Sequence, residues 1–380
     1  MARIALLGPF WPYRGGIAHF GAGLARALAE RGHDVRTVTF RRQYPERLFP
    51  GETQLEAGPA PSGVARAPAW LDVLDPRTWL RTAERVVADG ADVVVLPYWT
   101  PMMGPMWGVI ARRLRARSVG VVALVHNAIP HERRPGDLVL GRFALAAVDG
   151  ALALSDRVAA DLERLDVRAA VRTVPHPVYD GFGPAPPRAT SRQALDLAGD
   201  APTFLFFGFI RPYKGLHVLL DAWGGVVERV PDARLVVAGE FYADEAALRE
   251  QAAPFGASVR FDAAYIPDDR VGLYFGAADA VVQPYVSATQ SGVAQIAFHY
   301  GRPVITTDVG GLAETVPDGE AGLVVPPGDP AALAAAMVRF VEQDLGERLE
   351  AGVRRVRAAY SWDRVAESLE TLAGVPPPRP

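Results

Sequence analysis

The chain alternates short runs of branched apolar residues with segments of helical spacing, and this alternation is what most limits its fold. In the first half the apolar runs span residues 2–7, 33–40, 91–99, 119–127 and 150–155. In the second half they span residues 203–208, 234–240, 258–262, 279–285, 302–307 and 321–326. Continuous β-branched runs separated by helices are typical of parallel strands covered on both faces. The sequence therefore predicts an α/β protein with two parallel sheets.

A stretch rich in Pro, Gly and Ala separates the two halves. It includes GFGPAPPRATS within residues 181–202, and its composition predicts a linker. We expect one domain over residues 1–180, a second over 181–358, and a closing helix with a Pro-rich tail over 359–380. Ligands of open α/β sheets bind at the carboxyl ends of the strands. The loops that follow the strands are therefore the places to look for chemistry.

Composition and charge exclude several classes of function. The net charge of −3 gives no basic field for nucleic acid. The absence of cysteine excludes disulfides and thiolate metal sites, and it indicates a reducing compartment, the cytoplasm. Residues 98–117 join Trp and Met side chains to four arginines. This segment is either a core helix whose arginines complement the helix dipole, or a helix in peripheral contact with the inner face of a membrane.

The loop within residues 208–223 has the pattern of a phosphate site. It follows an apolar run and precedes a segment of helical spacing, so loop amides and a helix N-terminus can face an anion. Arg211 adds a forked donor and Lys214 a point charge. Lys214 is the only lysine among 40 basic residues, which favours a position where arginine does not fit. The alternative is a lysine that merely caps the loop.

Gly15 and Gly16 precede the first predicted helix, where two glycines allow a ligand to approach the backbone closely. This is not the dinucleotide fingerprint, because Gly21 and Gly23 fall inside the helix. The second strand also ends in Arg41-Arg42, without an acidic residue for ribose. A nicotinamide-dependent dehydrogenase is therefore disfavoured.

Two further loops have polar residues at strand ends. His126 and Asn127 end an apolar run, so His126 either faces a ligand or merely hydrogen-bonds a neighbouring carbonyl. Residues 289–292 begin a helix, where Ser or Thr can cap while free N–H groups remain for an anion. Gly310-Gly311 repeats this design. Several such loops on one sheet edge predict an anion pocket.

Taken together, these loops resemble the retaining glycosyltransferases of the family-4 type, which have the GT-B fold of two facing Rossmann-like domains. The resemblance is carried by GPFWPYRGGIAHF, LVHNAIPHE, FFGFIRPYKG, SATQSGVAQIAFHYGRPVITTDVGGLAETVPDG and YSWDRVAESLE. It implies that the first domain binds the acceptor and the second the nucleotide-sugar donor, with the final helix crossing back. Arg211 and Lys214 would bind the diphosphate and His126 would touch the transferred sugar.

The resemblance also implies a donor-binding set of Gly15, Gly16, Asn127, Gly208, Glu240, Ile266, Thr289, Gln290, Ser291, Gly292 and Val293. Within it the glycine loop and the amides of Ser291-Gly292 would contact phosphate oxygens, and residues near Glu240 and Ile266 would line the base pocket. The family's Glu-x7-Glu pair is missing, because its positions are Ala288 and Ile296. Gln290 or Gln295 is the hypothetical substitute.

The implied reaction is a hexosyl transfer from a nucleoside diphosphate with retention of configuration. The acceptor would be a glycan, a lipid-linked sugar or a small molecule. No cofactor or metal is expected, since the chain has no Asp-x-Asp pair and two cations can stabilise the leaving phosphate. The alternatives are an epimerase or phosphorylase of the same fold, and a non-catalytic protein that binds nucleotide sugars.

Overall fold

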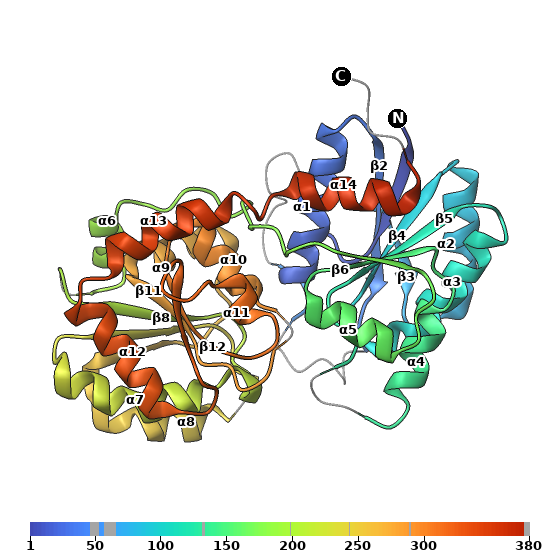
Figure 1. The fold of residues 1–380 in the computed structure, drawn as a ribbon. Coiled ribbons are helices and arrows are strands. Elements are labelled where there is room, and N and C mark those ends of the chain that lie inside the picture. Colours follow the sequence, from blue (N-terminus) through green and yellow to red (C-terminus); the bar gives the residue numbers. More distant parts are fainter. Residues whose placement is uncertain are drawn as a thin grey trace. The chain divides into compact units, whose positions relative to one another are not determined.

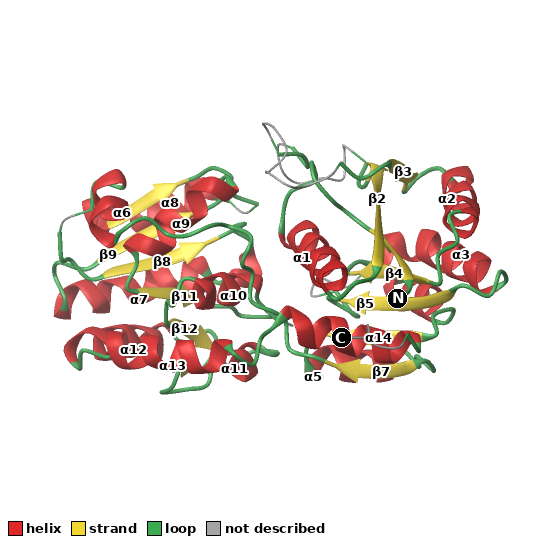
Figure 2. Ribbon diagram, turned by 90° about the horizontal axis from the view of Figure 1, so that it is seen from above, coloured by secondary structure: helices red, strands yellow, loops and turns green. Residues whose placement is uncertain are grey.

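The computed structural model describes residues 1–45, 53–56, 66–130, 134–197, 199–242, 244–288 and 290–375. The chain divides into two compact units (Figure 1). The first unit holds Met1–Pro177 together with Ser361–Pro380, and the second holds Val178–Tyr360. Each unit is a parallel sheet with helices on both sides (Figure 2).

The first unit contains a seven-stranded parallel sheet in the order β3-β2-β1-β4-β5-β6-β7 within the described residues. Its strands are β1 Arg3–Leu7, β2 Asp34–Arg42, β3 Ala69–Asp72, β4 Val93–Tyr98, β5 Gly120–Val125, β6 Gly150–Ala153 and β7 Ala170–Thr173. Its helices are α1 Gly16–Glu30, α2 Pro76–Ala88, α3 Gly104–Arg115, α4 Asp137–Leu145, α5 Asp156–Arg164 and α14 Trp362–Ala373. The order reverses between β1 and β4, which opens a switch point at their carboxyl ends.

Both faces of the first sheet are buried, as the uninterrupted apolar runs predict. Along β1, Ala5 and Leu7 join a core that includes Trp107 of α3. Ile4 and Leu6 are buried as well, and they point to the opposite face because successive strand residues alternate.

The closing helix α14 packs in the first unit, against α1 (Figure 1). Gly23 of α1 leaves the room for Trp362, whose ring a side chain at position 23 would overlap. Glu370 of α14 accepts two hydrogen bonds of 2.7 Å from Arg31 and lies 2.9 Å from the Nε2 atom of His33. Burial raises the pKa of Glu370, but these partners outweigh burial and hold its pKa below the usual value. Helix packing and a buried ion pair thus join the chain's two ends.

The second unit contains a six-stranded parallel sheet in the order β10-β9-β8-β11-β12-β13 within the described residues. Its strands are β8 Thr203–Phe207, β9 Arg234–Ala238, β10 Val259–Asp262, β11 Ala280–Gln283, β12 Val304–Thr307 and β13 Gly322–Val325. Its α-helices are α6 Arg188–Ala194, α7 Leu216–Arg229, α8 Glu245–Ala252, α9 Asp268–Ala277, α10 Gly292–His299, α11 Leu312–Thr315, α12 Pro330–Glu342 and α13 Gly346–Arg357.

Strand β8 shows how both faces of this second sheet are filled. Phe204 and Phe206 join the core that includes Trp223 of α7. Phe207 points to the other face, where its ring lies 4.9 Å from that of Phe275 in α9. The prediction of two parallel sheets covered on both faces is confirmed.

The stretch predicted as a linker is instead part of the second unit. Residues 188–194 form α6, whose Arg192 is buried and lies 2.9 Å from the Asp279 carboxylate. Ala185 lies against Gly272 of α9, where a side chain on the glycine would come within 3.2 Å of its Cα. The Pro-rich segment therefore packs, because small residues on a distant helix accept it.

The aromatic and basic segment at residues 98–117 contains the core helix α3. Met103, Met106 and Trp107 are buried within the first unit. The arginines that follow are paired inside the same unit: Arg113 and Arg117 contact Glu84, and Arg115 lies 2.9 Å from Asp149. Across the part of the chain that the structure describes, no helix has the length and apolar character to cross a membrane.

Candidate functional site

The basic loop of the second unit lies at the carboxyl end of the central strand β8. After β8, Arg211 leads into a short 3₁₀ turn, Pro212–Lys214, in which Pro212 fixes the backbone angle at the start. Gly215 then caps the start of α7 with φ of 70°, a conformation that favours glycine. A side chain at position 215 would overlap the carbonyl oxygen of Pro284. The sequence thus forces the loop back against the segment that follows β11.

The Lys214 side chain is buried, although a lysine side chain in water carries a positive charge. Its side chain belongs to a residue only 8% exposed, and Nζ lies 5.7 Å from the centroid of the Tyr285 ring. A side chain at Gly208 would meet Nζ at 3.3 Å, so the glycine leaves the ammonium its space. Burial, and then the nearby Arg211 charge, lower the pKa of Lys214 to about 7. An anion beside Lys214 would therefore stabilise the charged form of this lysine.

Arg211 has an aromatic neighbour of the same kind. Its Cζ atom lies 5.0 Å from the centroid of the Tyr242 ring. Within the described ranges, no Asp or Glu oxygen lies within 4.0 Å of either Arg211 or Lys214. Two cations that repel each other and have no carboxylate partner in the described part of the chain make this edge of the sheet electropositive. Such a place suits an anion with more than one charge.

The start of α10 lies on the same edge of the sheet. The Ser291 hydroxyl accepts a 3.4 Å hydrogen bond from the Ala294 N–H and a 3.0 Å hydrogen bond from the Gln283 amide. The first turn of α10 has no acidic residue, so its dipole faces no negative side chain of its own. A side chain at Gly208 would lie 3.5 Å from Val293, which places α10 beside the basic loop.

The predicted base-pocket residues lie on the neighbouring strands. The Glu240 carbonyl, after β9, accepts a 2.9 Å hydrogen bond from the Ile210 N–H after β8. Ile266 follows β10 and is buried. The strand order β10-β9-β8-β11 therefore brings together the loops with Ile266, Glu240, the cations and α10. Thr289 lies outside the described residues.

The positions of the missing Glu pair are apolar and buried. Ala288 is 9% exposed and packs with Tyr285 and Leu312, and Ile296 is 8% exposed. Gln295 is fully buried, and its amide nitrogen and oxygen have no hydrogen-bond partner among the described residues. Of the two hypothetical substitutes, only Gln290 is partly exposed.

In the first unit, the glycine loop and His126 lie at the carboxyl ends of β1 and β5. Gly15 has φ of 102° and precedes α1, and Gly16 begins that helix. His126 donates its backbone N–H to the Tyr98 carbonyl at 2.8 Å, and its ring meets Phe20 edge-on at 4.9 Å. Burial, and then His176, lower the pKa of His126 to about 3, so the ring is neutral. Asn127 is partly exposed beside it.

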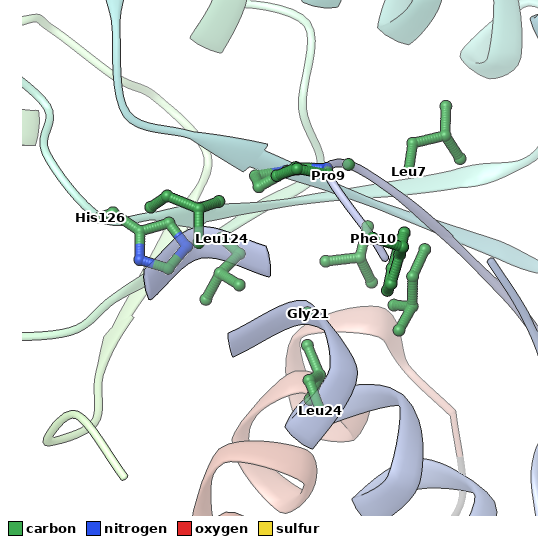
Figure 3. A pocket seen from close by; sticks show the side chains of 12 residues that line it. Leu7, Pro9, Phe10, Gly21, Leu24, Leu124 and His126 are labelled. Carbon is green, nitrogen blue, oxygen red and sulfur yellow. The ribbon is translucent and has the colours of Figure 1, made fainter. Parts of the chain in front are cut away.

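A small apolar cavity adjoins His126 (Figure 3). Phe10, Leu24 and Leu124 line it together with the histidine. Its volume of about 20 Å³ is close to that of one water molecule, so it does not hold a sugar. The cavity is therefore a packing gap beside the histidine ring.

The aromatic residues around the cations were not predicted from the sequence. Phe209 and Tyr242 stack with ring centroids 4.9 Å apart, and Tyr265 lies 6.2 Å from Phe209. The available signal was an aromatic residue just after each of the strands β8 and β9. It became informative only when the fold placed Tyr242 under Arg211.

Comparisons with known proteins agree with this arrangement. The family described as Glycosyltransferase Family 4 matches residues 14–180, and the family described as Glycosyl transferases group 1 matches residues 201–343. A D-inositol 3-phosphate glycosyltransferase of Frankia alni is 31% identical over 93% of each chain. One of Acidothermus cellulolyticus is 28% identical over 93% of this chain and 84% of its own.

The fold is shared with solved structures. Anabaena HepE in complex with UDP and glucose superposes with a TM-score of 0.76 and 16% identity, over 99% of this chain and 100% of its own. This likeness shows the fold, and the Frankia relative shows the family. The chain therefore belongs to the family-4 type glycosyltransferases and has their GT-B fold.

Proposed function

We propose that this glycosyltransferase moves a hexose-type sugar from a nucleoside-diphosphate sugar to an acceptor hydroxyl, with retention of configuration and without a metal. The observation that carries the proposal is the pair of cations after β8, Arg211 and Lys214, which have no carboxylate partner within the described ranges. A diphosphate is the common anion that matches a forked donor and a point charge together.

The chemistry follows from where charge develops. As the bond from the sugar to the diphosphate breaks, negative charge grows on the leaving phosphate. Arg211 and Lys214 stabilise that charge, and the ammonium of Lys214, whose pKa is lowered to about 7 in the free protein, becomes fully protonated beside it. The N-terminus of α10, with Ser291, Gly292 and Val293, adds free N–H groups. The acceptor hydroxyl attacks the same face of the sugar.

We assign donor binding to the second unit and acceptor binding to the first. The relatives named D-inositol 3-phosphate glycosyltransferase support a hydroxyl-rich acceptor of the sugar or cyclitol class. The bound UDP and glucose named for HepE support a nucleotide-sugar donor. His126, neutral and at the end of β5, would contact the transferred sugar.

The first test is a thermal-shift screen against UDP-, GDP- and dTDP-sugars, because a ligand that binds the folded state raises its apparent stability. Release of nucleoside diphosphate is then measured with and without acceptors, and the anomeric configuration of the product by NMR. Release that needs an acceptor supports transfer. Isomerised nucleotide sugar, or phosphorolysis, would instead identify an epimerase or a phosphorylase.

The decisive variant is Lys214→Ala. It should remain folded and lower the transfer rate about 10²-fold or more, the usual scale for losing such a stabilising group. Arg229→Ala is the matched control, since Arg229 ends α7 and is paired with Glu342 at 2.7 Å. Near-normal turnover by a folded Lys214→Ala protein would contradict the assignment. Donor binding without turnover in the wild-type protein would favour a non-catalytic binding protein, which the apolar Ala288 and Ile296 make the second candidate.

A further inference from the structure

The Arg211 guanidinium is held by an aromatic face where many arginines of this chain are held by a carboxylate. Its Cζ atom lies 5.0 Å from the centroid of the Tyr242 ring. In the same unit, Arg192 and Arg302 lie 2.9 Å and 2.7 Å from carboxylate oxygens. A carboxylate occupies the N–H groups of a guanidinium, whereas an aromatic ring beside the guanidinium carbon does not neutralise them. Among the described residues, Arg211 is therefore held beside a ring and is not neutralised by a carboxylate.

Tyr242 is itself fixed in place by the sheet edge. Its backbone N–H donates to the Ile210 carbonyl at 2.8 Å, and the neighbouring Phe241 forms a parallel bridge with Ile210. Its ring stacks on Phe209 with 4.9 Å between centroids and 17° between planes. Tyr265 continues the group at 6.2 Å from Phe209. The position and orientation of the Tyr242 ring are thus fixed by its backbone hydrogen bond and by its stacking on Phe209.

We propose that Tyr242 is a positioning residue, which fixes the Arg211 guanidinium so that its N–H edge is presented to the diphosphate of the donor. The inference rests on the proposed function and deepens it. A free arginine side chain samples many rotamers and must give up that freedom when it binds. The ring at position 242 restricts this freedom before the donor arrives, so the diphosphate meets an ordered donor group.

The unit offers a matched comparison for this arrangement. The Arg249 guanidinium lies 4.8 Å from the centroid of the Phe261 ring, which is a similar stacking distance. Arg249, however, also donates a 2.8 Å hydrogen bond to Glu245 within α8. Its edge is already occupied by a carboxylate. Phe261→Leu therefore removes a similar ring from beside an arginine whose edge is already occupied; the Phe261 ring lies 6.1 Å from that of Phe241.

The experiment measures binding of inorganic pyrophosphate to the full chain by titration calorimetry. Tyr242→Leu should weaken the affinity about five-fold, the scale of a partly exposed cation–π contact, and Tyr242→Phe should stay within about two-fold of wild type. Phe261→Leu should also stay within about two-fold. In an Arg211→Ala background, Tyr242→Leu should cause no further loss, since the two residues act as one unit. Thermal unfolding checks that each variant is folded.

Equal pyrophosphate affinity in Tyr242→Leu and wild type would overturn the proposal. So would a loss of affinity on Tyr242→Leu that is equally large in the Arg211→Ala background and in the wild-type background. Arg211→Lys is the second route, because lysine keeps the charge but not the flat face. It should lose about as much affinity as Tyr242→Leu, and wild-type affinity in this variant would equally refute the idea. Sugar transfer is measured separately on the wild-type protein. Failure of the variant series in an active enzyme removes only the role of Tyr242, whereas an inactive wild type removes the proposed function.

Discussion

Replacing the buried lysine with methionine should stabilise the protein, and the gain should shrink as the pH rises. In the unfolded chain Lys214 has a pKa of 10.5, and burial beside Arg211 lowers its pKa to about 7 in the folded unit. Between these two values the unfolded state binds more protons than the folded state, so wild-type stability rises with pH. Below pH 7 the loss of stability that the buried Lys214 charge causes is fully present and no longer changes with pH. Methionine has a similar shape and no charge.

The magnitude follows from the same two pKa values. At pH 7 the lysine costs the folded state about 4 kcal/mol, and at pH 9 about 2 kcal/mol. Lys214→Met should therefore have a higher free energy of unfolding than wild type. This advantage should be about 2 kcal/mol smaller at pH 9 than at pH 7. Urea unfolding at both values measures the difference. Arg229→Met is the control, because it also replaces a basic residue near α7's end with methionine, but one in an exposed ion pair with Glu342, and it should shift stability equally at both pH values.

A gain that is the same at pH 7 and pH 9 would refute this reasoning, and so would a wild-type protein more stable than Lys214→Met at pH 7. The variant should also lose the stabilisation that pyrophosphate confers on the wild type. A lysine that costs stability in the free protein is understandable only if its charge is used when a ligand is bound.

Two further predictions concern the framework. Glu370→Ala should lower the free energy of unfolding by about 3–5 kcal/mol at neutral pH, since it leaves Arg31 and His33 without their buried partner. The stabilisation that Glu370 gives the wild-type protein should fade as acid protonates its carboxylate. A loss under about 1 kcal/mol in urea unfolding would contradict this. Gly215→Ala should lower the free energy of unfolding by more than Gly301→Ala, which should lower it by about 1 kcal/mol. Both glycines have positive φ, but of these two positions only 215 would bring the new side chain against backbone atoms. Equal thermal shifts in these two variants would show that the contact is unimportant.

The strands were predictable where the sheet buries them on both faces. The run at 203–208 has no polar residue after Thr203, because every position of β8 is covered by α7 on one side and α9 on the other. Strand β7 was not predicted: Ala170–Thr173 forms an edge of the first sheet, and all four residues are exposed. An edge strand with exposed side chains has no apolar run from which to recognise it.

The cations were also visible in the sequence, because a charged pair directly after a buried strand has few structural uses. Their surroundings were not visible. Tyr242 supports Arg211 only because β9 pairs with β8, and the stretch 181–202 packs only because glycines of α9 make room for it. The sequence by itself determined the alternation of strands and helices, the glycine and basic loops, and the family. The tertiary structure decided which rings and helix ends surround Arg211 and Lys214, since contacts between residues distant in the chain depend on strand order, which local patterns of hydrophobicity do not encode.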